Sequence, residues 1–93
     1  MNNTHAVILS SATNNAVVQM PGRKYPGVVI QGDTLMSIIH EIEKVRDTLL
    51  QGKSNEAISD IKYLLEDLTG RIDFYEKVLE ENNIQIPYKR GRG

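Results

Sequence analysis

The chain of 93 residues contains no cysteine. This absence excludes a disulfide framework and a thiol nucleophile, and it removes the commonest ligands of structural zinc. No apolar run approaches the roughly 20 residues that a membrane span requires, and the first residues lack the basic segment of a secretory signal. We therefore expect a cytoplasmic protein that does not enter a membrane.

Acidic residues are missing from positions 1–32, although the whole chain has a net charge of only −1. All 12 acidic residues lie within 33–88, whereas the 11 basic residues divide into two before that segment, six within it and three in the tail 89–93. An acidic body is thus flanked by two basic edges, and this distribution bears on the choice of partner more than the net charge does. We expect a single domain over residues 1–88 and a disordered basic tail over 89–93. A chain of this size buries only about 60–65% of its unfolded surface, so oligomerisation is an expected source of stability.

Short β-branched and apolar runs alternate with turn formers in the first third of the chain. Residues 5–9 and 16–20 indicate two strands separated by the polar stretch 10–15, and residues 28–31 follow a Pro-Gly-rich connection as a third strand. The simplest arrangement is a small antiparallel meander.

Two amphipathic helices are predicted after the third strand. Apolar residues recur at alternating spacings of three and four from Leu35 to Leu49 and again from Ile58 to Leu79. The connection between the two stripes is short, which favours an antiparallel hairpin with a heptad-type seam. The second helix is the longer, so its far end must bury against the sheet or against another chain. The expected fold class is therefore α+β, with a β-meander of two or three strands followed by this helical hairpin.

The expected ends of these helices follow from local residue preferences. We expect Asp33 to cap the first helix, Gly52 to end it, and Ser54 to cap the second, which runs to about Asn83. Gly70 lies inside the second helix at a cost of roughly 1 kcal/mol relative to alanine, as a kink, a close helix crossing or a tolerated glycine. Residues 84–88 alternate like a brief edge strand.

Residues 21–27, here called the basic loop, are the main candidate for a recognition surface. They contain two Pro-Gly turns and the trio Arg23, Lys24 and Tyr25. Arginine offers a bidentate fork to a carboxylate or phosphate, and tyrosine an amphipathic contact. Glycine recurs every five positions from Gly22 to Gly32, where we expect positive φ or close backbone approach. The alternative is a solvated hairpin loop whose tyrosine covers the edge of the core.

A second candidate surface is an acidic stripe on the second helix, formed by Glu66, Asp73, Glu76 and Glu80. Such a stripe either meets a cationic partner or is a solvated face that is partly neutralised by pairs along the helix. We find no histidine or carboxylate group with metal-ligand spacing, no nucleophile paired with a base and no cofactor signature. We therefore predict no metal, no cofactor, no catalytic residue and no enzymatic activity.

The segment 21–33 has the pattern Pro-Gly-Arg-x-x-Pro-Gly-Val-x-x-Gln-Gly-Asp and precedes a helix. Over residues 6 to about 50, the chain resembles a family of small bacterial proteins of unknown function, which implies no established activity or catalytic residues. In its compactness, its lack of cysteine and its acidic body, the chain is more loosely similar to the cytosolic immunity proteins that neutralise secreted toxins.

These features predict a non-enzymatic protein-binding module. The leading interpretation is an immunity or antitoxin-type inhibitor that blocks a partner such as a cationic toxin stoichiometrically, through the basic loop and the acidic stripe. Two alternatives stay open, namely a small nucleic-acid-binding regulator that uses the basic loop and tail, and a structural oligomerisation module. The overhanging second helix adds the expectation of a homodimer.

Overall fold

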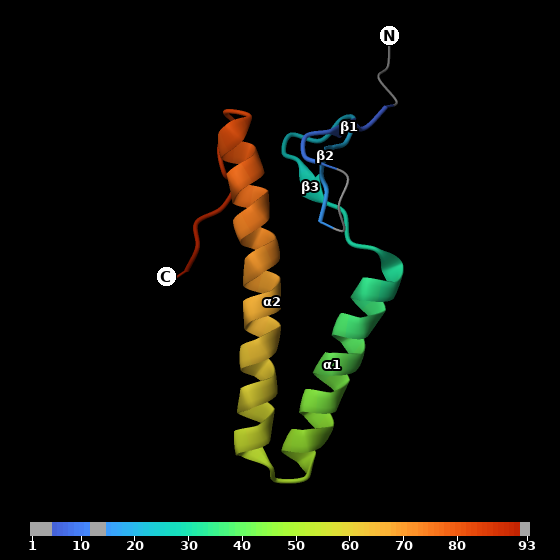
Figure 1. The fold of residues 1–93 in the computed structure, drawn as a ribbon, viewed down its shortest axis with the longest axis vertical. Coiled ribbons are helices and arrows are strands. Elements are labelled where there is room, and N and C mark those ends of the chain that lie inside the picture. The colour runs from blue at the N-terminus through green and yellow to red at the C-terminus, as the bar shows by residue number, and fades with distance from the viewer. Residues whose placement is uncertain (1–4, 12–14, 92–93) are drawn as a thin grey trace. The chain divides into compact units, whose positions relative to one another are not determined.

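The computed structural model describes residues 5–11 and 15–91. It contains three strands and two helices in the order β1 (Val7–Ile8), β2 (Val17–Gln19), β3 (Gly27–Val28), α1 (Gly32–Leu50) and α2 (Ser54–Glu81) (Figure 1). The predicted α+β fold is confirmed, with a three-stranded antiparallel sheet followed by a helical hairpin whose second helix is the longer. The chain divides into two compact units. Unit 1 comprises Met1–Val29 and Ile72–Gly93, and unit 2 comprises Ile30–Arg71.

The sheet has the strand order β1-β2-β3, and both pairs of neighbours are antiparallel. The facing residues are Val7 with Gln19, Ile8 with Val18, Val17 with Val28, and Val18 with Gly27. The strands are shorter than predicted, and at the end of β1 a polar side chain takes the place of a ladder partner. The amide of Val17 donates to the hydroxyl oxygen of Ser10 at 2.9 Å, so this side chain replaces a backbone acceptor at the end of β1.

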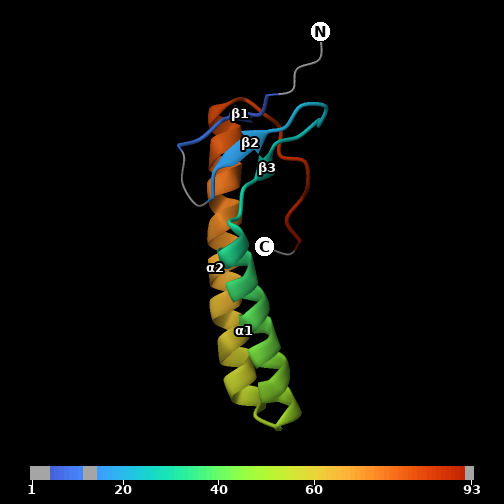
Figure 2. The same ribbon diagram turned by 90° about the vertical axis from the view of Figure 1, so that its right-hand side faces the viewer.

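The core of unit 1 lies between the sheet and the last turns of α2 (Figure 2). Its buried residues are Val17, Tyr75, Val78 and Leu79. Partly buried residues from the strands, from α2 and from the segment that follows it cover this centre, namely Leu9, Val28, Phe74, Ile84 and Ile86. The far end of the long helix is therefore buried against the sheet of its own chain.

The start of α1 differs from the prediction. Its N-cap residue is Gln31, which makes no side-chain capping hydrogen bond, and Gly32 already has helical geometry. The prediction that Asp33 is the N-cap is therefore wrong, since the N-cap lies two residues earlier. Asp33 lies in the first turn, where its Oδ1 accepts a hydrogen bond from the amide of Thr34 at 2.8 Å. A carboxylate at this place still interacts favourably with the helix dipole.

The end of α1 confirms the prediction for Gly52. This glycine has φ = +78°, and its amide donates to the carbonyl oxygen of Leu49 at 2.9 Å. The amide of Lys53 donates to the carbonyl oxygen of Thr48 at 3.1 Å, which completes a Schellman motif. Helix α2 begins at Ser54, which is therefore its first helical residue and not the predicted N-cap. The helix ends in the same way as α1, at Asn83, a non-glycine residue with φ = +56°.

Within unit 2, α1 and α2 meet through only part of the predicted apolar seam, since Ile38 and Val45 of the α1 stripe face inward and the rest of the stripe does not. The buried or half-buried residues of α1 are Thr34, Ile38, Val45 and Thr48, and those of α2 up to residue 71 are Ala57, Asp60, Leu64 and Arg71. Most of the stripe that begins with Leu35 and Ile42 is exposed instead. The prediction was wrong for the rest of the seam because the apolar arc of each helix is wider than one neighbouring helix can cover. The periodicity does not say which edge of the arc makes the contact.

Residues 84–88, predicted as an edge strand, have no strand geometry. They turn back at the end of α2, and the segment runs beside this helix (Figure 1). Over the part of the chain that the structure describes, neither helix combines the length and apolar character needed to cross a membrane.

Candidate functional site

The basic loop has a defined backbone shape. The amide of Arg23 donates to the carbonyl oxygen of Met20 at 3.3 Å, with Pro21 and Gly22 at the two central positions of the turn. Gly22 has φ = +77°, as a type II turn requires at this position. The side-chain amide of Gln19 donates to the carbonyl oxygen of Arg23 at 2.6 Å, so the loop is also tied to the end of β2.

The other end of the basic loop is anchored by Tyr75 of α2. The hydroxyl of Tyr75 donates to the carbonyl oxygen of Pro26 at 2.7 Å, and this hydrogen bond is buried. Burial raises the pKa of Tyr75, so its hydroxyl stays protonated as a donor. The sequence identified Tyr75 only as a member of an apolar stripe. Its 49-residue separation from Pro26 leaves no local pattern that could have revealed the contact.

The predicted trio of the basic loop lies at the surface. Arg23 and Lys24 are exposed, and Tyr25 is half-buried. The ammonium nitrogen of Lys24 lies 5.4 Å from the centre of the Tyr25 ring, within the range of a cation–π interaction. Both readings of Tyr25, as a contact residue and as a cover for the core edge, are compatible with its partial burial.

The expectation for the other two recurring glycines is wrong. Gly27 and Gly32 have no positive φ, and an added Cβ would meet nothing within 4 Å at either position. Gly27 is part of β3, and Gly32 is the first residue of α1, so both have ordinary strand or helix geometry. Only the glycine of the turn, Gly22, needs its conformational freedom.

The acidic stripe of α2 is partly occupied by the chain itself. Arg90 forms ion pairs with Asp73 at 2.6 Å and with Glu76 at 3.0 Å. The hydroxyl of Tyr88 donates to the same Glu76 carboxylate at 2.8 Å. Glu80 is exposed in unit 1, and Glu66 is exposed in unit 2. The stripe therefore offers a partner fewer unpaired carboxylates than the sequence suggested.

These contacts change the acidity of the groups involved. Hydrogen bonds from Arg90 and then from Tyr88 lower the pKa of Glu76 below its usual range. Burial, followed by the hydrogen bond to Glu76, raises the pKa of Tyr88 to about 12. The ring of Tyr88 also stacks on that of Tyr75, with 6.5 Å between the centroids. Of the predicted basic tail, Arg92 and Gly93 lie outside the described residues.

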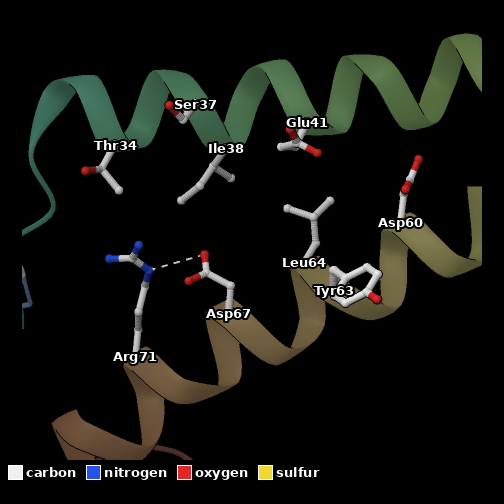
Figure 3. Close-up of a pocket in the computed structure, with 9 residues that line it drawn as sticks. All are labelled: Thr34, Ser37, Ile38, Glu41, Asp60, Tyr63, Leu64, Asp67 and Arg71. Carbon is white, nitrogen blue, oxygen red and sulfur yellow. Dashed lines mark ion pairs between the residues drawn. The ribbon is translucent and has the colours of Figure 1, made fainter.

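An open groove of about 360 Å³ lies between the helices of unit 2 (Figure 3). Four residues of α1 and five of α2 line it, namely Thr34, Ser37, Ile38, Glu41, Asp60, Tyr63, Leu64, Asp67 and Arg71. Arg71 pairs with Asp67 one helical turn away at 3.5 Å. Sequence reasoning missed this groove, because its lining combines charged residues from two helices that share no motif. Among residues 5–11 and 15–91, no group of three or more histidine or carboxylate side chains is suited to hold a metal ion.

One protein-family model matches residues 1–88, a range that includes the basic loop and both helices. The chain belongs to the family of unknown function DUF6959. Searches of curated proteins and of solved structures found no match. Membership in DUF6959 agrees with the predicted resemblance to a family of unknown function. The likeness to immunity proteins and the part that the Pro-Gly pattern plays in the family stay predictions.

Proposed function

We propose that this DUF6959 protein is a non-enzymatic protein-binding module of the inhibitor type, whose basic loop contacts an acidic surface of a partner protein. The observation that supports this most is the fixed backbone of the loop. The turn at Gly22 shapes the start of the loop. Hydrogen bonds from the Gln19 side chain and from the Tyr75 hydroxyl then fix the carbonyl groups of Arg23 and Pro26. A loop that is ordered before binding loses little conformational entropy on association.

The exposed side chains of the loop determine the chemistry of the partner. Arg23 can make a bidentate pair with a carboxylate, and Lys24 adds a second positive charge at the same place. Neighbouring positive charges steer association toward an acidic surface and raise the rate of encounter. The acidic stripe contributes less, because a cationic partner would have to displace Arg90 from Asp73 and Glu76.

An immunity or antitoxin role is the specific form of this function that the charge distribution predicts. In that form, the partner is a toxin whose working surface carries carboxylates within reach of the basic loop. The exposed Glu80 beyond the Arg90 contacts adds a second point of attachment for a basic group.

Affinity capture from a lysate of the protein's own organism, after nuclease treatment, tests the proposal. The baits are the unchanged protein, the Arg23→Glu/Lys24→Glu variant and a Lys44→Glu/Lys53→Glu control. The control changes the net charge by the same amount as the loop variant, but its two substitutions lie on exposed residues of unit 2, outside the basic loop. We expect the unchanged protein and the control to retain one protein in near-stoichiometric amount, and the loop variant to retain roughly tenfold less of it.

Equal retention by all three baits would contradict the role of the basic loop. Capture of nucleic acid alone in the untreated sample, with loss after nuclease treatment, would support the nucleic-acid-binding alternative and overturn the proposal. Far-ultraviolet circular dichroism of each bait checks that the substitutions leave the helices intact.

A further inference from the structure

Unit 2 carries an exposed apolar surface that spans both of its helices. This surface, here called the hairpin face, consists of Leu35, Ile39, Ile42 and Leu49 on α1 and Ile58, Ile61, Leu65 and Leu68 on α2. Each of these residues exposes between 38% and 61% of its surface. Isolated exposed leucines are normal on a protein surface, but eight exposed leucine and isoleucine residues on the two helices of one hairpin exceed such isolated cases.

The hairpin face lies to one side of the contact between the two helices. Each residue of an α-helix advances by about 100° around the axis. On α1, the exposed stripe centred near Leu35 and Ile42 is therefore about a quarter turn from the half-buried Thr34 and Thr48. On α2, the stripe from Ile58 to Leu68 is displaced from the inner side by a similar angle in the same rotational sense. Because the helices run antiparallel, equal rotations bring both stripes onto the same side of the hairpin.

The helices of unit 2 have little buried apolar surface of their own. Among residues 30–71, all of which the structure describes, only Val45 and Ala57 are buried. Amphipathic helices in proteins draw most of their stability from burial of the apolar face. Burial of the hairpin face against another surface would therefore add more to the stability of this hairpin than to that of a hairpin with a larger core.

We propose that two copies of this chain associate through the hairpin face to form a four-helix bundle. This contact is independent of the basic loop, which lies in unit 1. In such bundles each helix faces two neighbours, one within its own hairpin and one across the interface. The inner side of each helix and its part of the hairpin face, about a quarter turn apart, match this requirement.

The spacing and composition of the face favour a second copy over an unrelated protein. Leu35, Ile42 and Leu49 lie seven residues apart, and Ile58 precedes Leu65 by the same interval, as in helices that pair in a coiled-coil manner. The eight apolar residues of the face are all leucine or isoleucine. Such a surface resembles a domain core cut in half, as obligate homodimer interfaces do.

The charges beside the face also permit self-association. Glu43 on α1 and Lys62 and Glu66 on α2 lie on its outer side, and Arg46 lies within the α1 stripe, seven residues after Ile39; all four are exposed. Each helix thus brings one acidic and one basic residue, so a second copy can align opposite charges despite the acidic character of the chain. The eight half-exposed side chains present on the order of 600 Å² of apolar surface, close to the roughly 800 Å² per partner of a standard interface.

Light scattering coupled to gel filtration tests the proposal on the full chain at several concentrations. We expect a mass of two chains for the unchanged protein and one chain for the Ile42→Glu/Leu65→Glu variant. The matched control is Met36→Glu/Tyr63→Glu, which places the same charges on exposed residues of the same helices outside the face. This control should keep the mass of two chains.

A second measurement leaves the face nearly intact, in case the charged variant loses its helices. Because the chain has no cysteine, a single Ile42→Cys substitution provides a unique thiol. A short bismaleimide should cross-link two copies of this variant, and cross-linking should fall at least tenfold for Lys44→Cys, on the opposite side of α1. A one-chain mass for the unchanged protein at high micromolar concentration would overturn the proposal. So would a two-chain mass for a folded Ile42→Glu/Leu65→Glu variant, or a complex in which only a different protein covers the face.

Discussion

At the scale of single residues, Tyr75 has two roles in unit 1. The residue is 5% exposed and belongs to the core with Val17 and Leu79. Its hydroxyl reaches through that core to the carbonyl oxygen of Pro26. The same side chain thus stabilises the contact between sheet and helix and fixes one end of the basic loop. This coupling connects the stability of the unit to the shape of its candidate recognition surface.

Replacement of Tyr75 by phenylalanine should destabilise the protein by about 1–2 kcal/mol. The substitution keeps the ring in the core but leaves the carbonyl oxygen of Pro26 without its donor. The free energy of unfolding, measured by urea denaturation, gives the result. Tyr63→Phe is the control, since Tyr63 is 70% exposed, and its effect should stay within about 0.5 kcal/mol. A loss in Tyr75→Phe no larger than that of the control would contradict the proposed role of the hydroxyl.

At the scale of secondary-structure elements, the sequence correctly predicted those features that depend on residues close together in the chain. The spacings of three and four identified both helices, and Gly52 marked the end of α1 because a residue there needs positive φ. The inner side of the hairpin was not predictable in the same way. Thr34 and Leu64 face inward, whereas the residues that follow them in the sequence, Leu35 and Leu65, stay exposed. In each helix the inward residue and the exposed one are thus sequence neighbours at the edge of a wide apolar arc. That choice depends on tertiary packing, which no single segment encodes.

A glycine in the interior of α2 allows the contribution of helix propensity at a single position to be measured. Gly70 has helical geometry, and an added Cβ there would meet nothing within 4 Å. Gly70→Ala should therefore raise the free energy of unfolding by about 0.5–1 kcal/mol, because alanine has the higher helix propensity. Gly22→Ala is the matched comparison and should lower it by roughly 1–2 kcal/mol, since φ at this position is +77°. Thermal and urea denaturation of both variants measure the two effects.

A destabilising Gly70→Ala would show that the glycine serves a close helix approach after all, as one reading of the sequence allowed. A neutral Gly22→Ala would show that the turn of the basic loop relaxes to another conformation, and that the loop is less rigid than its hydrogen bonds indicate.

At the scale of the whole molecule, the uneven charge distribution has a structural counterpart within unit 1. The sequence predicted an acidic body with a basic, disordered tail, and Arg90 of this tail pairs with Asp73 and Glu76. The complementary charges were visible in the sequence, since the two acidic residues lie three positions apart on one helical face. Their meeting with Arg90 depends on the reversal of the chain at Asn83, which has positive φ without being glycine. A reversal of this kind is easily missed when glycine is the expected signal.

This folded-back segment should make stability depend on pH in a predictable direction. The pKa of Glu76 is lowered in the folded protein, so its carboxylate stabilises the fold at neutral pH. That contribution is fully present above the ordinary pKa of a glutamate and is lost as the pH falls through the lowered value. Urea denaturation from pH 7 to pH 3 should therefore show that the unchanged protein loses its advantage over Glu76→Gln as the solution becomes acidic. Glu66→Gln, ten residues earlier on α2, is the control, because it removes an exposed carboxylate that does not contact Arg90 or Tyr88. If the difference between the unchanged protein and Glu76→Gln did not vary with pH, the pairs with Arg90 and Tyr88 would contribute no stability in solution.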